Sequence, residues 1–353
     1  MSDPIPPGDL SGNTRRGMGP RRIASVLTAV CIVLAAAWVA RFIWYDQPRL
    51  LREAGPIALD LASPIPPPGL LPPRDLPGNA ADDYLRALNH YNARCAPMLA
   101  RRTLNPILRE PAVSPVELHN IIAGARKRAC SFYSASGGSG SRIFIVQPGS
   151  RPYPMRRTDD PFALRPYIAP MRTMAQACLN RGKELEQAGH LDEARRIYMA
   201  VVRLGWNLRQ DPGCLMDIEL SLEIERKGLH YLEVFLARTH AQPVRELCHR
   251  YAQEVEGFLN QVHAKYVQLD NPEAAKLILR RDASPIWRME AAVALSGYRY
   301  TAHPGILERL SIRLTLLQAE HDADPCVRRA ARHAALMGPA DWRNMASDAG
   351  PRQ

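Results

Sequence analysis

The 353-residue chain carries 46 Lys and Arg residues against 35 Asp and Glu, a net charge of +11, and 46% of its residues are apolar. A chain of this length and apolar fraction can form a sizeable core in one large or two smaller domains, which excludes wholesale disorder. The basic residues are 41 arginines and five lysines. We interpret this bias as the codon preference of a GC-rich bacterial genome, and an attraction to anionic partners is the alternative.

The most hydrophobic part of the chain lies near its N-terminus. Residues 23–40 contain no charged side chain, and Trp44 and Tyr45 follow shortly after. A membrane-spanning helix needs about 20 apolar residues, and Trp and Tyr favour the lipid headgroup zone. The sequence therefore predicts a single transmembrane helix over residues 23–45, in contact with the lipid bilayer, after an N-terminal tail of residues 1–22.

The orientation of this anchor follows from its flanking charges. Four arginines precede the apolar run: Arg15, Arg16, Arg21 and Arg22. The positive-inside rule then predicts a cytoplasmic N-terminus and a large domain outside the cytoplasm, at the cell membrane. A cleaved signal peptide is the alternative, because residues 35–37 are small alanines of the kind a signal peptidase reads. A lipoprotein site at Cys31 is not expected, because the residue before it is the bulky Val30.

Prolines dominate residues 46–78. Nine of them occur there: Pro48, Pro56, Pro64, Pro66, Pro67, Pro68, Pro72, Pro73 and Pro77. Because proline blocks helices and favours an extended chain, this segment is predicted to be a stalk between the membrane and the domain. A proline-rich docking site for a partner is the alternative.

The globular part is predicted to be all-α and to begin near residue 79. Asn79 is a candidate cap for a first helix, and Ser114 begins a capping box with Glu117 for a second one. The helical pattern ends after Cys130. Residues 131–161 contain a Gly/Ser-rich run and a short β-like run, so we expect an irregular or hairpin-like excursion there.

Residues 175–205 read AQACLNRGKELEQAGHLDEARRIYMAVVRLG and resemble one tetratricopeptide repeat over about residues 175–208. Gly182, Gly189 and Ala194 stand where that family has small residues, and Leu185, Leu191, Tyr198 and Val201 match its apolar positions. Cys178, Arg181 and Trp206 depart from the pattern. The resemblance implies a pair of antiparallel helices, and two longer amphipathic helices are predicted after Pro212 and Pro243.

The C-terminal part repeats itself after forty residues. PIWRMEAAVAL at 285–295 aligns with PCVRRAARHAA at 325–335, and a helix-capping residue precedes each proline: Ser284 in one and Asp324 in the other. The pattern resembles HEAT-like repeats, in which stacked helix pairs bury alanine faces. An irregular helical bundle is the alternative. We therefore divide the globular part into a helical domain at 79–270, HEAT-like repeats at 271–340 and a tail at 341–353.

No catalytic, cofactor-binding or metal-binding residue is predicted. The Gly/Ser run precedes a strand and lacks a lysine, unlike a phosphate-binding loop, and the residue two positions after Ser139 is Ser141 rather than the glycine of a serine nucleophile elbow. His230 with Glu233, and Cys248 beside His249, lack the spacing of a zinc site. The carboxylates Glu219, Glu223 and Glu225 precede Arg226 and Lys227, which indicates a charged helix surface.

Seven cysteines occur, six of them outside the apolar run: Cys95, Cys130, Cys178, Cys214, Cys248 and Cys326. In an oxidising compartment they allow three disulfides, and buried thiols are the alternative.

These features lead to three hypotheses. The first is a non-enzymatic, membrane-anchored, α-solenoid-like protein that binds a protein or peptide partner at the cell envelope. The second is an envelope enzyme that acts on an anionic polymer. The third is a basic, cytoplasm-facing domain that binds nucleic acid, a partner that we do not expect for a domain outside the membrane.

Overall fold

The computed structural model describes residues 20–41, 43–44, 48–49, 52, 57, 59, 61–104, 111–132, 143–144, 153–154, 167–210, 215–301 and 304–336, and their side chains except at 20–27, 96–104, 143–144, 153–154 and 300–301. The described part is mostly helical with short strands, which confirms the all-α prediction. The chain forms two compact units, residues 1–53 and 54–353. Residues 1–19, the Gly/Ser run at 136–141 and the tail at 341–353 lie outside the described residues.

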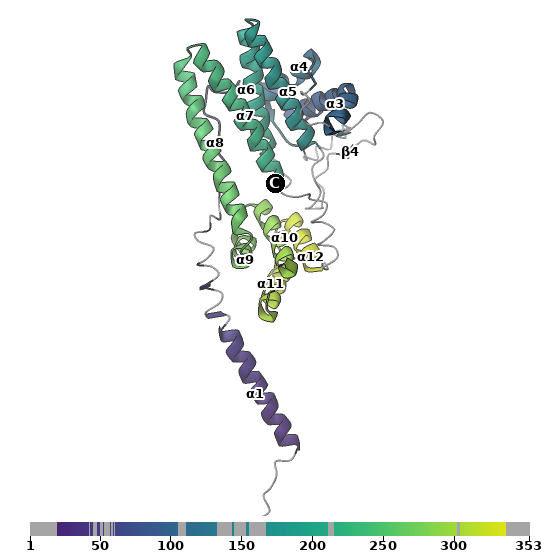
Figure 1. Ribbon diagram of the computed structural model, residues 1–353, viewed down its shortest axis with the longest axis vertical. Helices are drawn as coiled ribbons and strands as arrows, with labels where there is room; N and C mark the ends of the chain where they lie inside the picture. The colour runs from purple at the N-terminus through teal and green to yellow at the C-terminus, as the bar shows by residue number, and fades with distance from the viewer. Residues whose placement is uncertain are drawn as a thin grey trace, which may run out of the picture. The chain divides into compact units, whose positions relative to one another are not determined.

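The N-terminal unit contains helix α1 (Pro20–Arg41), which covers most of the predicted anchor (Figure 1). Large apolar side chains are exposed along it: Val30, Ile32, Val33, Leu34, Trp38 and Val39. Within the described part of the chain, no helix reaches both the length and the hydropathy of a membrane span.

The second unit is built mainly from helices. Its elements in chain order are β1 (Leu76–Asn79), α3 (Ala80–Leu104), α4 (Pro115–Ala125), β2 (Lys127–Ala129), β3 (Ile143–Phe144), β4 (Tyr153–Pro154), α5 (Ile168–Gln187), α6 (Leu191–Leu208), α7 (Leu215–Arg238), α8 (Gln242–Gln268), α9 (Pro272–Arg281), α10 (Pro285–Thr301), α11 (Ile306–Ala319) and α12 (Pro325–Leu336). From α5 to α8 each helix packs against the next, and α9 to α12 form a second group beyond the end of α8 (Figure 1).

The predicted helix starts are largely confirmed. Asn79 Oδ1 accepts the N–H of Ala81 at 3.1 Å, and Ser114 and Glu117 form the predicted capping box at the start of α4. Asp324 Oδ1 accepts the N–H of Cys326 at 2.8 Å, which caps α12. At α10 the carboxylate of Asp282 accepts the N–H of Ser284, so Asp282 rather than the predicted Ser284 side chain organises that turn.

In the described part of the chain, two short sheets accompany the helices. Strand β3 pairs with β4 in an antiparallel arrangement, in agreement with the predicted excursion. Strand β1 pairs with β2 in parallel, a pairing that the sequence analysis did not predict. The β1–β2 pair joins the residues before α3 to those after α4, so the two ends of this helix pair lie together.

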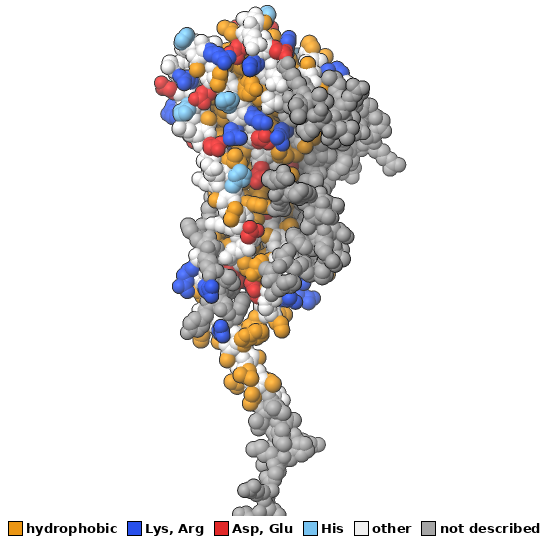
Figure 2. Space-filling view, viewed as in Figure 1, with side chains coloured by type: hydrophobic (Ala, Val, Ile, Leu, Met, Phe, Trp, Pro, Cys, Tyr) orange, Lys and Arg blue, Asp and Glu red, His pale blue; other side chains and the backbone are white. Residues whose placement is uncertain are grey.

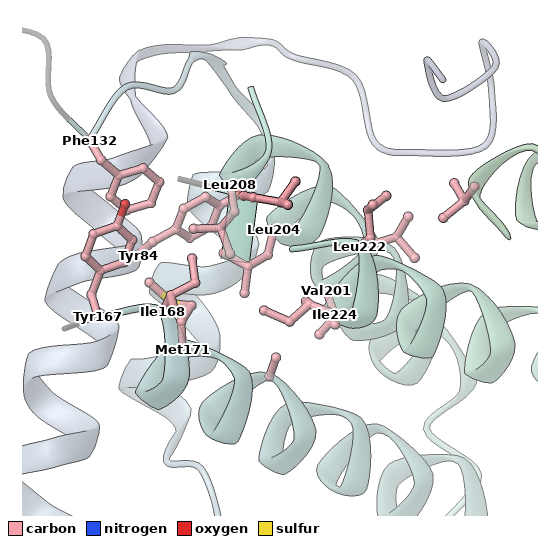
Figure 3. Packing of buried hydrophobic residues seen from close by; sticks show 14 of the residues in the cluster. Tyr84, Phe132, Tyr167, Ile168, Met171, Val201, Leu204, Leu208, Leu222 and Ile224 are labelled. Atoms are coloured by element: carbon pink, nitrogen blue, oxygen red, sulfur yellow. The ribbon is translucent and has the colours of Figure 1, made fainter. Parts of the chain in front are cut away.

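The main core lies between α3, α5, α6 and α7. Figure 3 shows Ile168 and Met171 of α5 beside Val201 and Leu204 of α6. Phe132 and Tyr167 stack with their ring centroids 5.0 Å apart, and they bring the two ends of the sequence between 132 and 167 together. Burial of these large side chains supplies the main stabilisation of the unit, about 1.5–3 kcal/mol for each one fully buried.

Glycines allow the helices to approach closely. A Cβ on Gly182 of α5 would lie 2.5 Å from the ring of Tyr198 on α6, and a Cβ on Gly205 of α6 would lie 2.5 Å from the backbone N of Glu225 on α7. Gly189 has a φ of +83° in the turn between α5 and α6, a conformation that favours glycine. These residues fix the spacing of the three helices.

The proline-rich segment is not a free stalk over its whole predicted length. Its described residues Ile57, Leu59 and 61–75, which we call the strap, belong to the second unit, where Leu70 and Leu71 are buried. Ile57, Leu59 and Leu61 also pack against the core. The stalk prediction for residues 46–78 is therefore wrong for the strap, because most of its described Ile and Leu side chains pack against the core rather than face solvent.

Four cysteines among the described residues of this unit are buried thiols. Cys95, Cys178, Cys248 and Cys326 form no disulfide. Burial raises the pKa of Cys178 and of Cys248 to about 12, so both thiols are protonated and unreactive at neutral pH.

Candidate functional site

Cationic side chains of α6, of its C-cap residue Arg209 and of α8 hold the strap through its backbone. Three hydrogen bonds do this: Lys265 Nζ to the carbonyl of Leu59 at 2.7 Å, Arg209 Nη2 to that of Pro64 at 2.7 Å, and Arg203 Nη2 to that of Pro72 at 3.0 Å. A proline-rich segment has few backbone N–H donors, but each of its residues retains a carbonyl acceptor. Cationic side chains, which are hydrogen-bond donors only, are therefore well matched to its backbone. The strap is therefore a structural part of the second unit.

A buried polar centre lies where the strap meets α6, α7 and α8. Arg209 Nε donates to Glu225 Oε2 at 2.7 Å, and the Tyr251 hydroxyl donates to Oε1 of the same carboxylate. Arg209 also donates to the Ser63 hydroxyl. Glu225 is completely buried, and burial raises its pKa although Arg209 acts in the opposite direction. A buried pair of this kind is costly to break, because either partner alone is an uncompensated charge.

A second polar centre lies nearby at the C-terminal end of α6. The guanidinium of Arg74 lies 4.1 Å from the ring centroid of Trp206, and that of Arg203 lies 5.1 Å from it. Asn207 accepts a hydrogen bond from Arg74 and donates one to Tyr84. Burial, helped by the neighbouring Arg74, lowers the pKa of Arg203 to about 10. Neither arginine forms an ion pair with a carboxylate of the described residues.

These two centres are suited to holding the strap rather than to catalysis. Their arginines donate to backbone carbonyls of the strap or lie over Trp206, and the buried Glu225 is fully engaged by Arg209 and Tyr251. A catalytic carboxylate needs access to a substrate proton. No sequence pattern predicted these residues, and the prediction of a charged helix surface for Glu225 is wrong, because Glu225 is buried.

The other side chains that the sequence analysis considered form ordinary surface contacts. His249 Nδ1 lies 3.0 Å from Glu233 Oε1, and Glu223 pairs with Lys227 at 3.0 Å. Glu219 lies 3.8 Å from His263. Within the described residues, no group of three or more His, Cys, Asp or Glu side chains is placed to hold a metal ion.

The candidate interaction surface lies on α11. Four large apolar side chains are exposed there, and they define what we call the α11 stripe: Ile306 at 67%, Leu310 at 51%, Leu314 at 59% and Leu317 at 42%. Their spacing of four, four and three residues places them along one side of a helix. The opposite side contains the buried Ile312 and Leu316, so α11 is apolar on both sides although only one side is packed.

Charge is mixed on the face of the helical unit that Figure 2 shows. Figure 2 shows basic, acidic and histidine side chains interspersed over the part of the helical unit that is visible at the top. Exposed ion pairs occur among the described residues, such as Arg181 with Glu184 at 3.2 Å. This face gives no support to a continuous cationic groove for an anionic polymer.

Comparisons with protein-family models, with curated proteins and with solved structures returned no match.

Proposed function

We propose that this protein is a non-enzymatic, membrane-anchored helical-repeat protein that binds a protein partner through the α11 stripe. The α11 stripe is the single observation that carries the proposal. A contiguous row of large apolar side chains in water favours burial, at roughly 25 cal/mol for each Å² covered, and such rows are typical of interaction sites. The HEAT-like resemblance of residues 285–337 and the tetratricopeptide-like resemblance of residues 175–208 support a repeat architecture, since stacked helix pairs commonly present binding surfaces.

The anchor is the second part of the proposal. Helix α1 has 22 residues, which corresponds to a length of about 33 Å, close to the hydrocarbon thickness of a bilayer. Its exposed apolar side chains and the arginines before it support insertion with the N-terminus in the cytoplasm and the helical unit outside it. Residues 46–56, which precede the strap, would then be the spacer.

Partner binding can be tested by placing a photoactivatable residue at position 310 of the full-length protein in the cells that produce it. We expect one discrete crosslinked protein that is not obtained from position 216 on α7, where Met216 is also 50% exposed. Equal products from both positions, or no product from position 310, would contradict the proposal.

Anchoring needs a separate test. The full-length protein should stay with membranes during alkaline carbonate washing, while a chain that begins at Ala54 should be soluble. Protease added to intact cells or spheroplasts should digest the helical unit but spare the N-terminal tail. Release of the full-length protein by carbonate would contradict the anchor, and a mature form that begins near Trp38 would establish signal cleavage instead.

A further inference from the structure

The two C-terminal helix units share one arginine arrangement, which is repeated forty residues apart. Arg288 Nη1 donates to the carbonyl of Asp282 at 2.6 Å, and Arg328 Nη1 donates to that of Asp322 at 2.6 Å. Each also donates to the following carbonyl, Ala283 at 3.1 Å and Ala323 at 2.9 Å. Both guanidinium groups are thus fixed in the same way on the turn that precedes their helix.

The other edge of the Arg288 guanidinium connects the α9–α10 pair to the α11–α12 pair. Arg288 Nη2 donates to Asp322 Oδ1 at 3.0 Å, and Arg288 Nε lies 3.0 Å from Asp322 Oδ2, so an ion pair joins the two turns. One step earlier, Lys265 at the end of α8 pairs with Asp282. Each turn carboxylate therefore receives a cation from the preceding layer of helices.

Within the part of the chain that the structure describes, Arg328 is the last cation of this series. Its Nη1 is held as in Arg288, but Arg328 has no ion pair with any carboxylate in the described part of the chain. The edge of the Arg328 guanidinium that corresponds to the Asp322-facing edge of Arg288 therefore has no carboxylate partner among the described residues.

The α11 stripe lies where a further helix layer would pack. Ser311 and Thr315 of α11 face α9, since they accept hydrogen bonds from Lys276 at 2.9 Å and Arg280 at 2.8 Å. A helix turns by about 100° per residue, which places Ile306, Leu310 and Leu317 on the side away from α9. Exposed Arg309 and Arg313 lie beside them. The apolar surface and the basic residues thus belong to the same end of the stack.

We infer that the partner is another protein whose terminal unit is an antiparallel helix pair with an Asp or Glu in the turn between its helices. That carboxylate pairs with Arg328, and an apolar helix face covers the α11 stripe. The inference depends on the proposed function and specifies the chemistry of its partner. A second copy of this chain suits the site less well, because its corresponding carboxylates Asp282 and Asp322 are already paired with Lys265 and Arg288.

The test uses the crosslink from position 310 in full-length protein that also carries a substitution at Arg328. Arg328→Gln should lower the yield about ten-fold or more, since a hydrogen bond to a charged group is lost, and Arg328→Lys should retain part of it. Arg332→Gln is the matched control, because the Arg332 side chain is 65% exposed on the same helix and pairs only loosely with Glu320 at 3.6 Å. It should leave the yield unchanged.

The crosslinked site and the identity of the product decide the rest. Mapping should place the partner residue on a helix next to an acidic inter-helix turn, and Arg328→Asp should bind again when that acid is replaced by arginine. A crosslink that does not respond to Arg328→Gln overturns this inference and leaves the proposed function intact. Absence of any specific crosslink overturns both. A product that joins two copies, or position 310 to residues 338–353 of the same chain, overturns the partner assignment.

Discussion

Arg209 Nη2 lies 2.7 Å from the carbonyl oxygen of Pro64, and this contact joins residues that are 145 positions apart in the sequence. The same guanidinium pairs with the buried Glu225 on α7. The strap and the helices are therefore connected through one buried charge network, and the stability of each depends on the other.

The strap should be required for the stability of the helical unit. A chain that begins at Ala54 should unfold cooperatively in urea, whereas a chain that begins at Gly78 lacks Leu70, Leu71 and the carbonyls that hold Arg203, Arg209 and Lys265. Loss of the two buried leucines alone should lower the free energy of unfolding by about 3–6 kcal/mol. Circular dichroism during urea titration measures this, and equal midpoints for the two chains would show that the strap is only a spacer.

The buried pair predicts a large effect of a single substitution. Glu225→Ala leaves Arg209 buried without a carboxylate, so the free energy of unfolding of the chain from Ala54 should fall by about 3–5 kcal/mol. Glu184→Ala removes the exposed partner of Arg181 and should change it by less than about 1 kcal/mol. Similar shifts for both variants would contradict the burial of Glu225.

The crossing of α6 and α7 can be tested at Gly205. In Gly205→Ala the new methyl would lie 2.5 Å from the backbone N of Glu225, so the helices must separate, and we expect a loss of about 1–3 kcal/mol or more. Gly257→Ala on α8 is the control, because nothing lies within 4 Å of the added Cβ. It should stabilise the protein by about 0.5–1 kcal/mol, since alanine favours helix more than glycine does. Melting curves of the two variants should move in opposite directions, and a shift in the same direction would refute the contact.

The C-terminal units bury small residues. Ala331 on α12 is completely buried, while the Arg332 side chain is 65% exposed. Ala331→Leu should cost about 1–3 kcal/mol through overpacking, and Arg332→Leu should stay within roughly 0.5 kcal/mol. Denaturant midpoints of the chain from Ala54 give both values. If the two variants behave alike, the packing of α12 against α10 is not as described.

Glu117 should make stability dependent on pH. Burial by itself would raise the pKa of Glu117, but hydrogen bonds from Arg94, the Ser114 N–H and His90 outweigh it and hold the pKa below its usual value. The stabilisation is then present above the unfolded pKa of about 4.3 and is lost as the pH falls through the folded pKa. The difference in unfolding free energy between the natural protein and Glu117→Gln should therefore shrink between pH 6 and pH 3. A difference that does not change with pH would contradict this assignment.

Local patterns were enough to determine the helices. The caps at Asn79, Ser114 and Asp324 depend on contacts within three residues, and the turn at Gly189 depends on one backbone conformation, so the sequence predicts them directly. The apolar spacing also predicted the two long amphipathic helices after Pro212 and Pro243, which are α7 and α8, because that spacing is set by the helix itself.

Only the tertiary structure decided the roles of the strap, Glu225 and Arg328. A backbone carbonyl carries no sequence signal, so the contacts of Pro64 with Arg209 and of Leu59 with Lys265, across 145 and 206 residues, could not be read from composition. The sequence does not distinguish a buried glutamate from an exposed one. Glu225 is buried and Glu223 is not because Glu225 lies on the side of α7 that faces α6 and the strap. The proposed role of Arg328 likewise depends on its comparison with Arg288. The hydrogen bonds and ion pairs of the two guanidinium groups can be compared only when the fold has placed both turns at the ends of stacked helices.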